Sequence, residues 1–293
     1  MVHDYLEILR RHAAPLTPLP TGESDRFGRL EKIRAVLFDV YGTLFISASG
    51  DIGTLRQAAK GPAFISALKA VGCEVRVEGA DGIRRLLAEI QRRHAASRDQ
   101  GIEYPEVDIA HVWQSLVERL RSEGLLNGKV FDNKRLAIEY EARTNPVWPM
   151  PGVRRCLSEL HERGLLLGII SNAQFFTPLL FPALLKKTTH QWGFDSALEQ
   201  YSYRHGHAKP GEFLFRTAAN ILLRRGISSR QVLYVGNDML NDIWPADKVG
   251  FQTVLFAGDA RSLRRRDHEP RIAGLEPDAV LTNLAQLPDL IPP

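Results

Sequence analysis

Short apolar runs recur along the chain, and each has the length of a buried strand. The runs lie at 35–38, 165–170, 232–235, 253–256 and 279–281. Continuous apolar runs of this kind are typical of parallel strands that are covered on both faces. Segments with helical spacing, 153–162 and 213–224, lie between them. This alternation predicts an α/β fold, a doubly wound parallel sheet of the Rossmann type with helices on both faces.

The pattern changes between residues 48 and 147, where helical spacing with charged outer faces takes over. The helical segments lie at 54–71, 83–96, 109–121 and 134–143, and no strong strand pattern separates them. Pro146, Pro149 and Pro151 then mark the return to the alternation of strands and helices. We therefore predict an α-helical insertion at 48–147, within a core domain made of 33–47 and 148–293.

Residues 1–32 form an extension ahead of the first strand. The apolar positions from Tyr5 to Ala13 predict a short amphipathic helix. Pro15, Pro18 and Pro20 then enforce an extended linker. We interpret the extension as a packing arm or an oligomer contact, and both a monomer and a homodimer remain open.

The composition of the 293 residues, 44% hydrophobic and 25% charged, is that of an ordinary globular protein. No apolar run has the length of a bilayer span, and the N-terminus does not resemble a signal peptide, so we expect a cytoplasmic protein without a membrane partner. Cys73 and Cys156 are expected to be separate buried thiols. The net charge of +4 suits a small anionic substrate and does not call for nucleic acid. The basic cluster Arg261–Arg266 is interpreted as a solvated loop in preference to a site for a phosphate-bearing partner.

Polar residues with catalytic potential follow the predicted strands. Asp39 comes directly after the first strand, Ser171 after the second, and Asp238 and Asp242 after the third; Lys209 precedes a helix. In open α/β sheets, ligands bind beyond the carboxyl ends of the strands. Each residue also has a structural explanation, as a turn residue, a helix cap or a solvated charge. Their joint occurrence in this order favours a catalytic site.

In this order the residues resemble the four signatures of the haloacid dehalogenase-like (HAD) hydrolase superfamily, over roughly residues 33–290. The resemblance implies that the helical insertion is a cap over the active site. It also implies that Asp39 is a nucleophile forming a covalent aspartyl intermediate, and that Lys209 neutralises charge on Asp39 and the substrate. The remaining implied substrate-binding residues are Thr43, Ser171, Asn172 and Tyr41.

Three carboxylates and an incoming phosphate in one pocket would repel one another strongly unless a cation offset them. Magnesium (Mg²⁺) suits oxygen ligands of this kind. The resemblance implies that the ion is held by Asp39, the backbone carbonyl of Tyr41, Asp238 and Asp242. Asn237 departs from the family pattern, since it stands where the first acidic residue is expected.

Tyr41 is the larger departure. Superfamily phosphatases carry a second aspartate there as the general acid and base, whereas haloacid dehalogenases, which use no metal, carry tyrosine. Two features count against a dehalogenase: Phe215 stands where dehalogenases have a tyrosine six residues after Lys209, and the last signature holds a pair of carboxylates. The leading hypothesis is a magnesium-dependent phosphatase of a small phosphorylated metabolite, performing poorly on alkyl phosphates. The alternatives are a metal-independent 2-haloacid dehalogenase and a catalytically silent binding protein.

Overall fold

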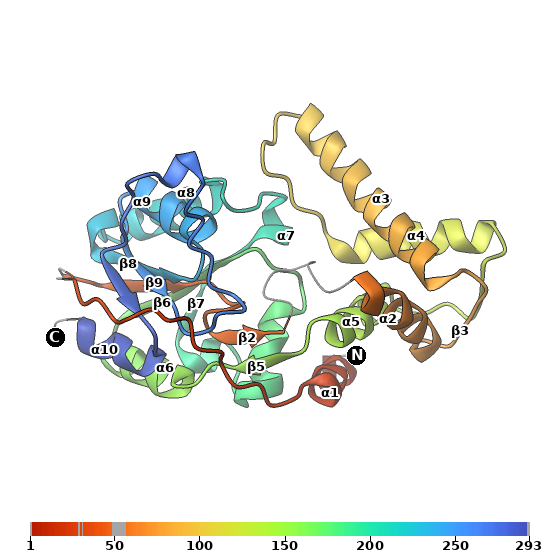
Figure 1. Ribbon diagram of the computed structural model, residues 1–293, viewed down its shortest axis with the longest axis horizontal. Coiled ribbons are helices and arrows are strands. Elements are labelled where there is room, and N and C mark those ends of the chain that lie inside the picture. The colour runs from red at the N-terminus through yellow and green to blue at the C-terminus, as the bar shows by residue number, and fades with distance from the viewer. Residues whose placement is uncertain (1, 29, 31, 49–56, 292–293) are drawn as a thin grey trace.

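A parallel sheet of six strands forms the centre of the protein, as the computed structural model of residues 2–28, 30, 32–48 and 57–291 shows (Figure 1). The strand order is β10-β9-β8-β1-β6-β7, and each neighbouring pair is parallel. The strands are β1 (Ala35–Phe38), β6 (Leu166–Ser171), β7 (Phe194–Tyr201), β8 (Val232–Gly236), β9 (Gln252–Phe256) and β10 (Ala279–Leu281). The predicted α/β fold is therefore confirmed.

Strand β1 lies in the middle of the sheet, and this position explains its composition. All four of its residues are buried, as expected for a strand with neighbours on both sides and helices over both faces. Phe38, its last residue, lies opposite Ile169 of β6 and Val235 of β8. The residues that follow these three strands therefore meet at one edge of the sheet.

Helices flank the sheet: α6 (Val153–Glu162), α7 (Ser202–His205), α8 (Phe213–Arg224), α9 (Trp244–Lys248) and α10 (Leu287–Leu290). The segments predicted at 153–162 and 213–224 are thus both helical. Strand β7 was not predicted, because its sequence mixes apolar and polar residues. It lies at the edge of the sheet, where Ser196 and Ala197 are exposed.

Helices also fill the insertion: α2 (Gln57–Ala70), α3 (Gly79–Asp99), α4 (Ile109–Ser122) and α5 (Asn133–Thr144). They pack around an apolar cluster of their own, in which the rings of Phe64 and Trp113 stack 5.5 Å apart. The sequence pattern shows no strong strand here, and it did not predict the short antiparallel pair of β3 (Cys73–Val75) and β4 (Leu126–Gly128). Residues 54–56 of the first predicted helix lie outside the described residues.

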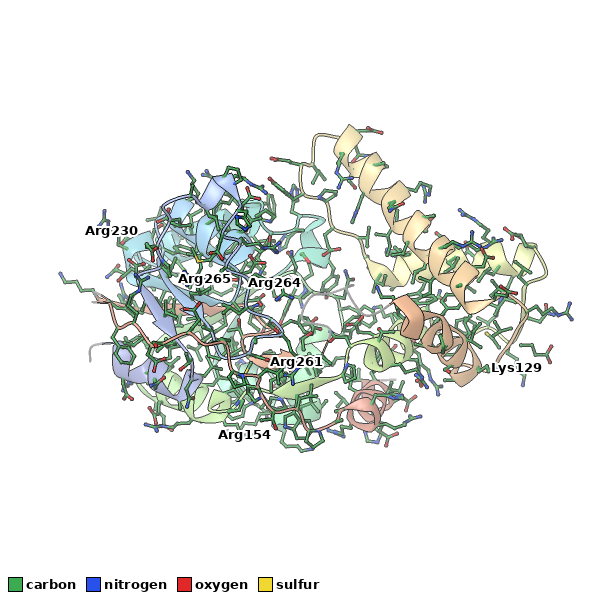
Figure 2. The ribbon with its side chains drawn as sticks, in the orientation of Figure 1. Lys129, Arg154, Arg230, Arg261, Arg264 and Arg265 are labelled. Atoms are coloured by element: carbon green, nitrogen blue, oxygen red, sulfur yellow. The ribbon has the colours of Figure 1, made fainter. Side chains whose placement is uncertain are left out.

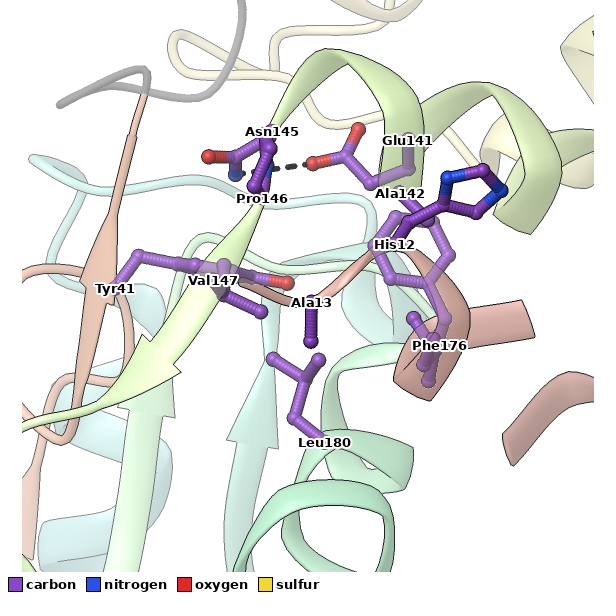
Figure 3. Close-up of a pocket in the computed structure, with 11 residues that line it drawn as sticks. His12, Ala13, Tyr41, Glu141, Ala142, Asn145, Pro146, Val147, Phe176 and Leu180 are labelled. Atoms are coloured by element: carbon purple, nitrogen blue, oxygen red, sulfur yellow. Dashed lines mark hydrogen bonds between the residues drawn. The ribbon is translucent and has the colours of Figure 1, made fainter. Parts of the chain in front are cut away.

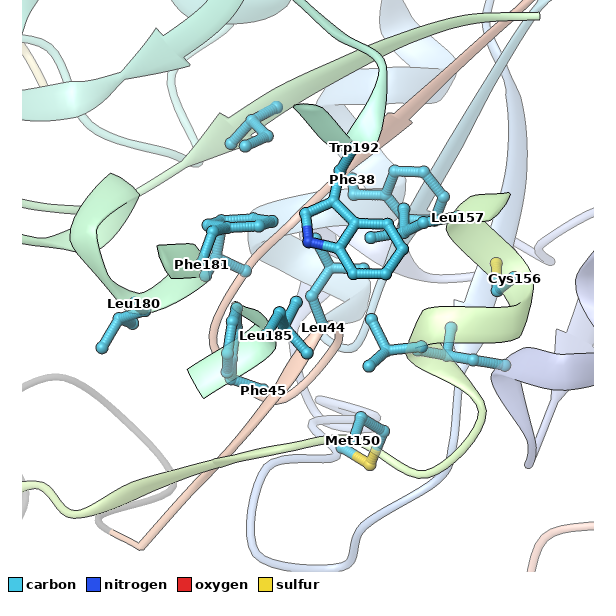
Figure 4. Packing of buried hydrophobic residues seen from close by; sticks show 14 of the residues in the cluster. Phe38, Leu44, Phe45, Met150, Cys156, Leu157, Leu180, Phe181, Leu185 and Trp192 are labelled. Atoms are coloured by element: carbon cyan, nitrogen blue, oxygen red, sulfur yellow. The ribbon is translucent and has the colours of Figure 1, made fainter. Parts of the chain in front are cut away.

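The chain leaves and re-enters the core through two short antiparallel strands, β2 (Phe45–Ser47) and β5 (Val147–Pro149). In the main apolar core, the ring of Phe45 of β2 packs edge to face on Phe181 (Figure 4). Phe181 packs in the same way on Phe194. This packing fixes the strand pair that carries the insertion. The exact boundaries of the core and the insertion remain predictions.

The N-terminal extension packs on its own chain. Helix α1 (Val2–His12) contacts α5, and residue Arg26 then forms a bridge with Val280 of β10. The amphipathic helix is thus confirmed, while the oligomeric state stays a prediction. Cys73 and Cys156 are buried free thiols. Among the described residues, no helix has both the length and the apolar character to cross a bilayer.

Candidate active site

The side chain of Lys209 lies between two carboxylates at the edge of the sheet. Its Nζ is 2.7 Å from Asp39 Oδ1 and 2.6 Å from Asp242 Oδ1. Burial lowers the pKa of Lys209, but attraction by Asp242 and Asp39 outweighs it, so that the pKa lies above its usual value. The lysine is therefore held as an ammonium that counters two negative charges. The structure thus brings together Asp39, Lys209 and Asp242 as predicted.

Asp39 keeps one oxygen available for chemistry. Its backbone nitrogen donates to the carbonyl of Val235, which fixes the residue directly after β1. While Oδ1 accepts the bond from Lys209, Oδ2 accepts no hydrogen bond from the described residues. A buried carboxylate, 5% exposed and held from one side in this way, is suited to act as a nucleophile.

Protein donors use both oxygens of Asp242. Oδ1 accepts from Lys209 and from the hydroxyl of Tyr234 at 3.0 Å, while Oδ2 accepts from the backbone nitrogens of Asn237 and Asp238, both at 2.9 Å. Burial raises the pKa of Asp242 to about 6; Lys209 opposes this rise, while the charge of Asp39 adds to it. Asp242 therefore acts as a structural counter-charge for Lys209.

Tyr234 is a site residue that the sequence analysis missed. Its hydroxyl lies 3.3 Å from Lys209 Nζ and shares its one hydrogen between the carbonyl of Ile170, at 2.8 Å, and Asp242 Oδ1. Phe215, which takes the place of the expected dehalogenase tyrosine, packs against its ring at 4.9 Å. A phenol hydroxyl is therefore present beside the lysine, although it comes from β8. Within an apolar strand, nothing in the local sequence distinguishes Tyr234 from a core residue.

The buried carboxylate of Asp238 forms an ion pair with the half-buried guanidinium of Arg266. The guanidinium reaches both carboxylate oxygens, with NH2 at 2.6 Å from Oδ2 and Nε at 3.2 Å from Oδ1. The backbone nitrogens of Leu240 and Asn241 also donate to Oδ1, and the Asn241 amide donates to Oδ2. The expectation that the basic cluster is a solvated loop is wrong for this arginine.

This arrangement does not fit the predicted magnesium site. A carboxylate binds Mg²⁺ through oxygen lone pairs, and those of Asp238 and Asp242 are engaged by protein donors. Asp39 alone presents an open oxygen, and the described part of the chain contains no group of three or more acidic, histidine or cysteine side chains that could hold a metal. Lys209 and Arg266 supply the positive charge that the magnesium ion was expected to supply, so the three carboxylates are offset without a metal.

Thr43 and Asn237 lie together on the side of the site that faces the loop after β9. The Thr43 hydroxyl donates to Asn237 Oδ1 at 3.1 Å, and Asn237 Nδ2 donates to the carbonyl of Ser262 at 2.6 Å. Gly42 has a φ of +84°, and a Cβ placed there would lie 2.4 Å from the Cβ of Ser262. A glycine is therefore required where this loop crosses the turn after Asp39.

Ser171 is the last residue of β6, and Asn172 directly follows it. Asn172 accepts from the backbone nitrogen of Lys209 at 2.7 Å and donates to its carbonyl at 3.2 Å, so it fixes the backbone of this lysine. The Ser171 hydroxyl is buried and has no hydrogen-bond partner among the described residues. Ser171 is not among the residues that line the cavity beside Asp39, so its role in substrate binding stays a prediction.

Tyr41 lines both the cavity beside Asp39 and a second pocket at the end of α5, which Figure 3 shows. Its hydroxyl is 3.0 Å from Thr177 Oγ1, and burial is the main cause of a pKa above the usual value. The nearby Glu141 and Asn145 side chains hydrogen-bond to each other at the end of α5. Tyr41 thus remains protonated and cannot exchange protons as the aspartate of a phosphatase does.

The site encloses a cavity of about 60 Å³, which borders a larger cavity of about 380 Å³ between the core and helices α2 to α5. Asn172 lines both. The smaller cavity is lined by Asp39, Tyr41, Asn172, Lys209, Asn237, Asp238, Asn241, Asp242, Ser262 and Arg264. Space beside Asp39 is therefore sufficient for a small polar group.

The fold and the site define an α/β protein in which a buried aspartate, Asp39, follows the central strand and pairs with Lys209. Residues 33–250 match the family model described as haloacid dehalogenase-like hydrolase, and the chain belongs to this family. No curated protein sequence matches the chain.

Solved structures agree with this fold. The 2-haloacid dehalogenase from Pseudomonas syringae pv. Tomato DC3000 is 19% identical, with a TM-score of 0.53, over 88% of this chain and 97% of that one. A HAD phosphatase from Thermococcus onnurineus is 18% identical, with a TM-score of 0.51, over 88% of this chain and 97% of that one. Since both a dehalogenase and a phosphatase share the fold to a similar degree, the choice between these activities depends on the site.

Proposed function

We propose that the protein is a metal-independent hydrolase of small monoanionic substrates, with 2-haloacids as the substrate class that fits best. The observation that carries this proposal is the charge balance of the site. Three carboxylates, Asp39, Asp238 and Asp242, face three cationic side chains, those of Lys209, Arg264 and Arg266. This balance requires no further cation before the substrate binds.

The charge of the substrate follows from the same balance. A phosphate monoester brings close to two negative charges at neutral pH, whereas a haloacid brings one. Without an additional cation, the second charge has to be buried beside Asp39 in a small cavity, which is electrostatically costly. A monocarboxylate is therefore favoured over a phosphate monoester.

The reaction begins with attack of Asp39 Oδ2 on the carbon that bears the halogen. An ester bond forms to Asp39 as the carbon–halogen bond breaks, and the halide leaves with the bonding electrons. Water then attacks the carboxyl carbon of that ester, which releases a 2-hydroxyacid, restores the Asp39 carboxylate and yields one proton to solvent. Lys209 stabilises the negative charge on Asp39 oxygens during both steps.

The second candidate, a magnesium-dependent phosphatase, is favoured by one observation. Asp238 lines the same cavity as Asp39 and would be a metal ligand if its carboxylate were free. This activity requires Arg266 to move away from Asp238, because the guanidinium engages both of its oxygens.

Product formation separates these candidates. Halide release from both enantiomers of 2-chloropropionate is measured with and without chelator, and phosphate release from acyl, aryl and alkyl phosphates is measured with magnesium and with chelator. Asp39→Asn is the control for both. The proposal expects halide release that chelator does not reduce and that Asp39→Asn abolishes. Magnesium-dependent phosphate release without halide release would contradict it in favour of the phosphatase, and inactivity in both assays would favour a binding protein.

A further inference from the structure

The segment 259–266, which follows β9, reaches over the cavity and brings two side chains to its wall. Ser262 and Arg264 line the same cavity as Asp39 and Lys209. None of the family signatures described above includes this segment. Figure 2 labels Arg261, Arg264 and Arg265 on it, beside the core.

Backbone hydrogen bonds fix Arg264 against the loop after β8. Its nitrogen donates to the carbonyl of Asn237 at 3.0 Å, and its carbonyl accepts from the nitrogen of Met239 at 2.9 Å. Asp238 lies between Asn237 and Met239, and its backbone forms a parallel β-bridge with that of Arg264. The position of Arg264 relative to the loop that carries Asp238 and Asp242 is therefore set by main-chain contacts.

The N-terminal extension holds the other end of this segment. The nitrogen of Leu19 donates to Asp259 Oδ1 at 3.1 Å, and its carbonyl accepts from the nitrogen of Ala260 at 3.0 Å. Arg261 donates to the carbonyl of Thr17 at 2.9 Å and to Asp259 Oδ2 at 2.8 Å. Asp259 itself is buried, 1% exposed, and it anchors this end of the segment from the protein side. The extension is thus a positioning element for the wall of the site.

The three arginines at the end of the segment differ in what they contact. Arg266 is committed to Asp238, and Arg265 lies 3.5 Å from Glu23 of the extension. Arg264 makes one side-chain hydrogen bond among the described residues, from NH1 to the carbonyl of Leu263 at 2.9 Å. A guanidinium carries five N–H donors, so most of those of Arg264, a residue that lines the cavity, form no bond with the described residues.

The hydroxyl of Ser262 provides a second, independent indication of a ligand. It is fully buried, lines the cavity and has no hydrogen-bond partner among the described residues. Buried hydroxyls are normally hydrogen-bonded, since an unsatisfied one is costly. A bound oxygen acceptor would satisfy this hydroxyl and the open N–H groups of Arg264 together.

We propose that Arg264 and Ser262 form the subsite that binds the carboxylate of the substrate, which places specificity for an anionic group on the segment after β9. This inference rests on the proposed function for the class of substrate. Arg264 binds the carboxylate through charge-assisted hydrogen bonds, and Ser262 donates one more. The substrate is thereby positioned with its α-carbon toward Asp39.

Equilibrium binding of a product tests the subsite without catalysis. Isothermal titration calorimetry of L-lactate is performed with the wild type, Arg264→Gln and Arg265→Gln, and lactamide serves as the uncharged probe. We expect at least tenfold weaker lactate binding for Arg264→Gln and no more than a twofold change for Arg265→Gln. Lactamide, which carries no charge, is expected to bind the wild type and Arg264→Gln equally. Ser262→Ala is expected to weaken binding about threefold to tenfold.

Equal lactate affinity of the wild type and Arg264→Gln would overturn the proposal, as would the absence of lactate binding to the wild type. Arg264→Lys keeps the charge and the stem, so partial binding is expected, and this variant replaces Arg264→Gln if the latter fails to fold. Binding that depends on Arg264 in a protein that releases no halide would leave the subsite in place and refute the haloacid substrate.

Discussion

Arg266 donates to both carboxylate oxygens of Asp238, with the shorter contact at 2.6 Å, and so neutralises an acid that lines the active-site cavity. The two residues lie 28 positions apart in the chain. This ion pair links the last signature of the family to the segment after β9. It also determines whether the carboxylate of Asp238 is free to bind a metal ion.

Replacement of Arg266 is expected to create a divalent-cation site. In Arg266→Gln the Asp238 carboxylate loses its counter-charge, which leaves an excess of negative charge beside Asp39. We expect the wild type to show no binding of Mn²⁺ at micromolar concentrations, measured by electron paramagnetic resonance, and the variant to bind it. Arg265→Gln, on the same segment but paired with Glu23, is the matched control. Mn²⁺ binding of equal strength in wild type and variant would refute the role given to Arg266.

Activity is expected to fall at acidic pH with an apparent pKa of about 6, the value to which burial raises the pKa of Asp242. Protonation of Asp242 removes one of the two carboxylates that hold Lys209 beside Asp39. We therefore expect kcat/KM to fall about tenfold per pH unit below this value. In Asp242→Asn, kcat/KM should no longer fall at acidic pH. In Asp247→Asn, a change at an exposed residue of α9, the fall should remain.

The stability contribution of Asp242 has the opposite dependence. Because the folded pKa lies above the usual 3.8, the folded protein binds the proton more tightly than the unfolded chain. This contribution is fully present below pH 3.8 and is lost as the pH rises through about 6. The free energy of unfolding of the wild type relative to Asp242→Asn, measured by urea denaturation, should therefore decrease over that window. An increase would contradict the assigned pKa.

Gly42→Ala should reduce activity more than its backbone strain alone explains. The new Cβ would lie 2.4 Å from the Cβ of Ser262, so the segment after β9 would be displaced from the cavity. Gly206→Ala is a matched control, with a φ of +69° and open space around the new methyl group. We expect each variant to lose about 1 kcal/mol from the positive φ, but only Gly42→Ala to lose at least about tenfold in kcat/KM. Similar kinetics of the two variants would show that contact with Ser262 is unimportant.

Glu89 is expected to stabilise the helical insertion. This buried residue of α3 accepts hydrogen bonds from Arg92 at 2.7 Å and from Arg93 at 2.8 Å, and the bonds from these arginines lower its pKa to about 2 despite burial. Glu89→Gln should cost about 1–3 kcal/mol in the free energy of unfolding at neutral pH. The same change at Glu118, on the exposed face of α4, should cost less than about 0.5 kcal/mol.

The Glu89 effect has a defined pH dependence. Because the folded pKa is depressed, the stabilisation is present above the usual value of 4.5 and is lost as the pH falls from there toward about 2. Thermal unfolding of Glu89→Gln and the wild type should therefore give a difference that narrows on acidification. A difference that does not depend on pH would show that packing, and not charge, explains the cost.

Local sequence pattern was sufficient for the residues that directly follow buried strands. Asp39, Ser171 and Asp242 could be predicted because parallel strands end at a common edge. Arg266 and Ser262 could not, since their partners lie far away along the chain and no periodic pattern encodes such a contact. Tyr234 was hidden by the apolar strand that contains it, and β7 by the exposed polar residues of an edge strand.

Hydrogen bonds join Thr17 and Leu19 of the N-terminal extension to the segment 259–266. The family match covers residues 33–250, and Ser262, Arg264 and Arg266 lie after its end. Thr17 and Leu19, which hold the segment in place, lie before its start. A version trimmed to the matched residues would retain the nucleophile and the lysine but lose the wall opposite them. We therefore expect the smallest active unit to extend beyond residues 33–250 at both ends.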